Sequence, residues 1–134
     1  DHRDLQKEYR RQRQICIRDR NTLAAIGINS NEKTLTTGIG KAGLSGPAIK
    51  PIALKMVWEV NNHIRIPIIG MGGIVNTDDV VEYMMAGSTA VQVGTANYRD
   101  PGIGEDIIDS LDSFINQTNR KSATDLIGSV RTLS

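Results

Sequence analysis

Two stretches indicate the fold class, and the first is IPIIGMGG at residues 66–73. A short continuous run of apolar residues, without polar alternation, predicts a strand that is covered on both faces, as in a parallel sheet. The second stretch, TAVQVGT at residues 89–95, repeats the pattern of a short strand that ends in glycine. Ligands of parallel α/β folds bind beyond the carboxyl ends of the strands. Both glycine-rich ends are therefore expected at one edge of the sheet, where a ligand would bind.

Helical patterns flank both strands. Apolar residues recur at helical spacing between Ile49 and Val60, which predicts a helix with one buried stripe. Asn76 is a candidate N-cap for a second helix, with Asp79 three residues later, and Gly87 is expected to end that helix.

The chain after the second strand continues the alternation. Pro101 opens a third helical pattern that runs to Ile115, and Ser122 with Asp125 predicts a short last helix. Alternating helices and strands with short connections predict an α/β fold with parallel strands. The chain has 134 residues, whereas a closed (β/α)8 TIM barrel needs roughly 250. We therefore expect a partial (β/α)8 TIM barrel.

The first third of the chain lacks this regularity. Residues 1–20 carry seven basic and four acidic side chains. This charged arm is expected to be a solvated helix or a disordered segment, with a basic patch for a phosphate-rich partner as the alternative. Residues 26–46 are rich in Gly, Asn and Ser, which predicts a long loop. We expect two parts, the arm over residues 1–20 and the partial barrel over residues 21–134.

The composition excludes several classes of protein. With 16 Lys and Arg against 15 Asp and Glu, the net charge is +1, so no global field attracts nucleic acid or an anionic membrane. No run of apolar residues is long enough for a transmembrane helix. The single cysteine, Cys16, excludes an internal disulfide and a multi-cysteine metal site within this chain. We expect a cytoplasmic enzyme, or a piece of one, without a nucleic-acid or membrane partner.

The glycines that end the strands are candidate ligands for a phosphate. N–H groups at the start of a helix are unpaired and lie at the positive end of its dipole, and glycine lets an oxyanion approach without a Cβ clash. In parallel barrels, the loops after the last two strands commonly bind phosphate in this way. The alternative is that each glycine merely permits a tight turn. The candidate residues are Gly46, Gly72, Gly73, Gly94 and Thr95.

No sequence motif supplies a catalytic group. The chain has no nucleophile-elbow serine, Walker A lysine or His-Glu-x-x-His helix. His63 is expected to face solvent at a helix end, and Cys16 is expected to be inert. From the residues alone, we expect a phosphate-bearing ligand, with no catalytic acid or base and no metal.

Three blocks of sequence stand in a specific order: GLSGPAIKP at residues 43–51, IGMGGI at residues 69–74 and VQVGTAN at residues 91–97. Together they resemble the C-terminal half of the class 1 dihydroorotate dehydrogenases, from about Asn21 to the C-terminus. The GTAN ending is more similar to the NAD-linked, heteromeric type B than to the fumarate-linked type. The resemblance implies an FMN-dependent barrel enzyme that oxidises dihydroorotate to orotate in pyrimidine biosynthesis.

The resemblance also implies site residues. Asn21 and Thr22 match an Asn-Thr pair whose side chains hydrogen-bond the orotate ring, and the five candidate phosphate ligands match positions that contact FMN. The family's catalytic base and its FMN-contacting lysine belong to the N-terminal half, so no catalytic residue is expected in this chain. Residues 17–20, three of which are charged, depart from the apolar strand that precedes the Asn-Thr pair in the family.

Partners are implied in the same way. An electron-transfer subunit with FAD and an iron–sulfur cluster would relay electrons to NAD. A homo-oligomer, or a separate N-terminal half, is expected to cover what a partial barrel leaves open. The alternative to a dehydrogenase is a catalytically inactive fragment or half-barrel that binds phosphate, FMN or a partner half without turnover.

Overall fold

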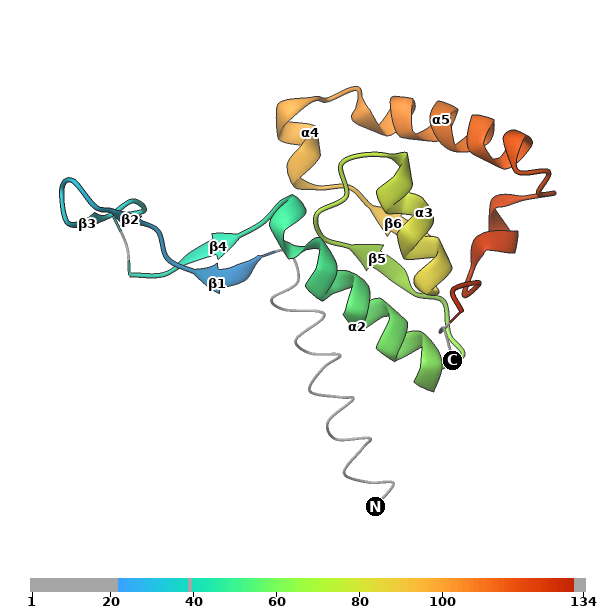
Figure 1. Cartoon of the computed structure of the whole chain (residues 1–134), viewed down its shortest axis with the longest axis horizontal. Helices are drawn as coiled ribbons and strands as arrows, with labels where there is room; N and C mark the ends of the chain where they lie inside the picture. The colour runs from blue at the N-terminus through green and yellow to red at the C-terminus, as the bar shows by residue number, and fades with distance from the viewer. Residues whose placement is uncertain (1–21, 39, 132–134) are drawn as a thin grey trace, which may run out of the picture. The chain divides into compact units, whose positions relative to one another are not determined.

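The computed structural model of the chain describes residues 22–38 and 40–131. They form two compact units, one within residues 1–44 and the other within residues 45–134 (Figure 1). The boundary expected between residues 20 and 21 lies outside the described residues, as do Asn21 and Cys16.

The first unit contains two short antiparallel strand pairs. Strand β1 (Leu23–Ala25) pairs with β4 (Ala42–Leu44), and between them β2 (Ile28–Asn29) pairs with β3 (Thr34–Leu35). The prediction of a continuous loop over residues 26–46 is therefore wrong for these segments. Strands of two or three residues are too short to show a period-two pattern above the turn residues around them.

The second unit is built on a parallel pair of strands. Strand β5 (Ile69–Met71) pairs with β6 (Ala90–Gln92), so the predicted α/β class with parallel strands is confirmed. Strand β5 begins at Ile69, three residues after Ile66, where the apolar run predicts its start. Pro67 has no N–H for a ladder, and the N–H of Ile68 donates to the hydroxyl of Thr89 at 2.8 Å.

The helices of the second unit follow the predicted order, with one addition. The capping box is present, because the Asn76 side chain accepts from the Asp79 N–H and the Asp79 side chain accepts from the Asn76 N–H. Gly87 ends that helix with a φ of 120°, as predicted. A short helix after the second strand was not predicted. The helical segments are η1 (Pro47–Ile49), α2 (Lys50–His63), α3 (Thr77–Ala86), α4 (Thr95–Arg99), α5 (Ile103–Gln117) and η2 (Ala123–Leu126).

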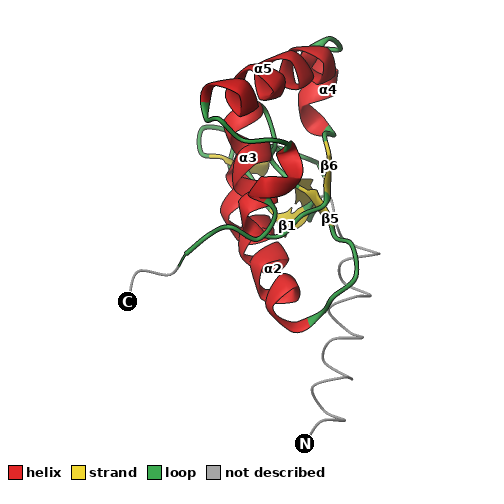
Figure 2. Ribbon diagram, turned by 90° about the vertical axis from the view of Figure 1, so that its right-hand side faces the viewer, coloured by secondary structure: helices red, strands yellow, loops and turns green. Residues whose placement is uncertain are grey.

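The core of the second unit lies on one face of the strand pair. Helices α2 and α3 pack side by side against this face, and α5 and η2 pack on α3 (Figure 2). Gly70, at the centre of β5, is buried, whereas its neighbour Ile69, which points to the other face, is 61% exposed. Coverage of both faces, which the apolar run predicts, is therefore not found in this chain, whereas Ile69 is exposed as expected for a partial barrel that leaves the inner faces of residues 66–69 and 90–93 open. No helix in the described part of the chain is long and apolar enough to cross a membrane.

Candidate phosphate-binding site

Three turns of the second unit meet beyond the carboxyl end of β5. A Cβ atom built on Gly46 would lie 3.8 Å from Cγ2 of Thr95, and one built on Gly73 would lie 2.7 Å from the carbonyl oxygen of Gly46. Gly72 directly precedes Gly73 in the chain, and Gly94 directly precedes Thr95. The structure thus brings all five predicted phosphate ligands to one edge of the strand pair.

The two glycines after β5 are required by the fold itself. Gly72 and Gly73 have φ values of 118° and 73°, a region that residues with a Cβ rarely adopt. A Cβ on Gly72 would lie 2.9 Å from the Cβ of Ala53, and a Cβ on Gly73 would lie 3.0 Å from the backbone nitrogen of Lys50. The tight-turn explanation therefore accounts for both glycines, and the case for an anion rests on the N–H groups around them.

Free N–H groups remain in the turns that meet beyond β5. Within residues 40–131, the N–H of Gly73 and the N–H of Thr95 donate to no other group. In contrast, Oδ2 of Asp79 accepts from the N–H groups of Val75 (2.8 Å) and Asn76 (3.2 Å). The Asp79 carboxylate thus engages the two N–H groups just before α3, and the free N–H of Gly73 is the candidate position for an anion.

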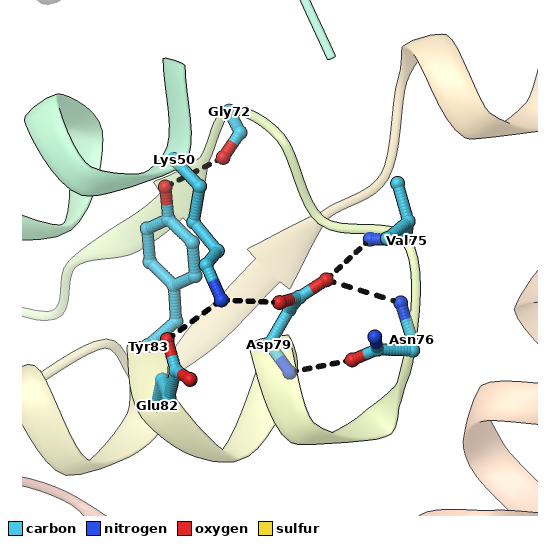
Figure 3. A network of polar contacts seen from close by, with 7 residues as sticks. All are labelled: Lys50, Gly72, Val75, Asn76, Asp79, Glu82 and Tyr83. Atoms are coloured by element: carbon cyan, nitrogen blue, oxygen red, sulfur yellow. Dashed lines mark hydrogen bonds and ion pairs between the residues drawn. The ribbon is translucent and has the colours of Figure 1, made fainter. Parts of the chain in front are cut away.

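A lysine at the start of α2 forms ion pairs with two carboxylates of α3. Nζ of Lys50 lies 2.5 Å from Oδ1 of Asp79 and 2.9 Å from Oε2 of Glu82 (Figure 3). Hydrogen bonds to Asp79 and then to Glu82 raise the pKa of the Lys50 ammonium above its usual value. Because two carboxylates already surround it, Lys50 holds α2 against α3 and is not a free cation for a phosphate.

A buried tyrosine of α3 forms a hydrogen bond with the turn that follows β5. The hydroxyl of Tyr83, on α3, donates to the carbonyl oxygen of Gly72 at 2.7 Å (Figure 3). Burial raises the pKa of this hydroxyl, and the charges of Asp79 and Glu82 add to the effect, so it stays a proton donor. No local sequence pattern marks Tyr83 or Lys50 as a site residue, because their contacts span 11 and 29 positions of the chain.

Of the two predicted substrate residues, only Thr22 is among the described residues, and it belongs to the first unit. Thr22 is exposed just before β1, and a Cβ on Gly43 of β4 would lie 2.5 Å from its side chain. Gly43 therefore leaves the space that the Thr22 side chain fills. Among the described residues, no group of three or more His, Cys, Asp or Glu side chains is placed to hold a metal ion.

A family model described as dihydroorotate dehydrogenase matches residues 4–115, so the chain belongs to the dihydroorotate dehydrogenase family. The matched span includes residues 4–20, where we expected no resemblance. The chain is 43% identical over 110 residues to the catalytic subunit of dihydroorotate dehydrogenase B (NAD(+)) from Bacteroides fragilis, and 44% identical over 108 residues to that from Halalkalibacterium halodurans.

These relatives are much longer than the chain. The alignments cover 82% and 81% of the chain but only 36% and 35% of the two relatives. Solved structures give the same result. A DHODH from Eimeria tenella in complex with ferulenol has a TM-score of 0.65 and 26% identity, with 80% of this chain and 29% of that chain covered. The ligand-free form of the same enzyme also has a TM-score of 0.65, with 28% identity and coverage of 81% and 31%.

Proposed function

We propose that the chain is the C-terminal part of an FMN-dependent dihydroorotate dehydrogenase, with the fold of a partial (β/α)8 TIM barrel. The observation that carries the proposal is the meeting of three turns, with free N–H groups at Gly73 and Thr95, in a chain 43% identical to the catalytic subunit of a type B enzyme. Backbone N–H groups in glycine turns bind the phosphate of a flavin nucleotide without a charged side chain.

The residues of this chain would bind and orient, and they would not remove protons. The N–H of Gly73 and the N–H and hydroxyl of Thr95 hold the phosphate of FMN, with Gly46, Gly72 and Gly94 shaping the turns. Asn21 and Thr22 hydrogen-bond the pyrimidine ring of dihydroorotate and orient it. Bound FMN supplies an acceptor for the hydride that dihydroorotate loses. The base that takes the proton belongs to the part of the enzyme outside this chain.

The remaining partners follow from the family. The relatives are named as catalytic subunits of NAD(+)-linked enzymes, and we place this chain in the same kind of assembly. An electron-transfer subunit with FAD and an iron–sulfur cluster would pass the electrons to NAD. A chain with a single cysteine is suited to the reducing cytoplasm, where pyrimidine biosynthesis would take place.

The alternative function is an inactive fragment that binds FMN or phosphate without turnover. The chain spans about a third of the length of its curated relatives. The purified chain is mixed with FMN and dihydroorotate, with and without the separately produced N-terminal part of a relative's catalytic subunit, which would supply the base. A shifted flavin spectrum, with orotate formed only when both parts are present, supports the dehydrogenase, and a shifted spectrum without orotate in either mixture supports the binding fragment. An unshifted flavin spectrum contradicts both.

A further inference from the structure

One side chain of the core reaches the turn where the phosphate is proposed to bind. Tyr83 has an exposed fraction of 0%, and its ring packs below Gly70, where a Cβ would lie 2.5 Å from the tyrosine Cδ1. Its hydroxyl donates to the carbonyl of Gly72 at 2.7 Å and lies 3.3 Å from the carbonyl oxygen of Met71. A ring held in this way fixes the hydroxyl in space.

The hydrogen bond also fixes the direction of the next N–H. The carbonyl of Gly72 and the N–H of Gly73 belong to one planar trans peptide unit, in which C=O and N–H point in opposite directions. Because the carbonyl points at Tyr83 in the core, the N–H of Gly73 points away from the core. This N–H donates to no other group in the described residues around it, and Gly73 is only half-buried.

This peptide unit needs such a restraint. Glycine adopts positive and negative φ with similar ease, so a peptide between two glycines can rotate at little cost. Gly72 and Gly73 both have positive φ here. Without the hydroxyl, the N–H of Gly73 would sample other directions, and an anion would have to restore the order on binding.

We propose that Tyr83 is a positioning residue for the phosphate end of the cofactor: its hydroxyl aligns the Gly72–Gly73 peptide so that the Gly73 N–H points at the phosphate. This inference rests on the proposed function. It adds that a side chain in the core, which never touches the ligand, sets the preference for a flavin that carries a phosphate.

The variant Tyr83→Phe tests the proposal, because it removes the hydroxyl and keeps the ring. FMN and riboflavin differ only in the phosphate, so their dissociation constants from the same chain, measured by flavin fluorescence, separate positioning from general damage. We expect Tyr83→Phe to bind FMN about three- to tenfold more weakly, the loss typical of one hydrogen bond, and to bind riboflavin as the unchanged chain does.

Thr89→Val is the matched control. The Thr89 hydroxyl bonds the backbone of Ile68 just before β5, as the Tyr83 hydroxyl bonds Gly72 just after it. The control variant should keep the ratio of the two dissociation constants. If Tyr83→Phe also keeps this ratio, or weakens both flavins equally, the positioning role is wrong. If the unchanged chain itself binds FMN no more tightly than riboflavin, the proposed phosphate site is wrong, which is a different failure.

A measurement on the unchanged chain covers the case in which Tyr83→Phe does not fold. The Gly73 amide resonance is followed in a ¹H–¹⁵N spectrum during titration with inorganic phosphate. We expect its shift to be among the largest in the second unit, since its N–H points at the anion. A Gly73 resonance that does not move while phosphate shifts the Thr95 amide would overturn the inference.

Discussion

A side chain at Gly73 should destabilise the second unit more than its backbone conformation alone explains. In Gly73→Ala, the alanine backbone would have to adopt a φ of 73°, which costs about 1–2 kcal/mol for a residue other than glycine. Its Cβ would also lie 2.7 Å from the carbonyl oxygen of Gly46 and 2.9 Å from the Cβ of Lys50. Overpacking of this kind adds about 1–3 kcal/mol, so the expected loss in the free energy of unfolding is about 2–5 kcal/mol.

Gly128→Ala separates the two costs. Gly128 has a φ of 67°, close to that of Gly73, but a Cβ there would meet only Nδ2 of Asn61, at 3.5 Å. It should therefore lose only the conformational part. Urea unfolding followed by circular dichroism gives both values. Equal losses for Gly73→Ala and Gly128→Ala would refute the close approach of the two turns.

Further predictions concern the ion pair, the pH dependence and the open sheet face. Lys50→Met should lower the free energy of unfolding, measured with urea, by about 1–3 kcal/mol, because it leaves the buried Asp79 without its cation. The control Lys55→Met removes an exposed ion pair with Glu59 and should lower it by less than about 0.5 kcal/mol. The raised pKa values of Tyr83 and Lys50 mean that the unfolded chain releases these protons first. The stabilisation by these two groups is thus complete below about pH 10, and the free energy of unfolding falls as the pH rises further. When urea unfolding is repeated over this pH range, Tyr83→Phe should make the fall shallower. An unchanged dependence of the free energy of unfolding on pH would contradict the burial of the Tyr83 hydroxyl. The exposed Ile69 face should cause self-association, and light scattering that gives a monomer would contradict this.

Local signals in the sequence predicted the elements that depend on nearby residues. The capping box at Asn76 and the glycine end of the same helix are set by residues three to four positions apart, so both were predicted correctly. The start of β5 was misplaced, because an apolar run does not reveal which of its residues pair with a neighbouring strand. The short strands of the first unit and helix α4 have too few residues for a periodic pattern.

The candidate site was predictable only in part. The glycines were found because their chemistry is visible in the chain, and the turns that hold them do meet. The groups that orient those turns were missed, because Lys50 reaches Asp79 across 29 positions and Tyr83 reaches Gly72 across 11. A lysine in a helix and a tyrosine on an apolar stripe can make many contacts. The packing of α2 against α3 brings Lys50 to Asp79, and the packing of α3 on the strand pair brings Tyr83 to Gly72.

Competition between inorganic phosphate and the two flavins for the unchanged chain is the decisive test of the phosphate site. We expect FMN to bind more tightly than riboflavin, and phosphate to weaken the apparent affinity for FMN while leaving riboflavin binding unchanged. Equal affinities for the two flavins, with no effect of phosphate on either, would contradict a phosphate site at Gly46, Gly73 and Thr95.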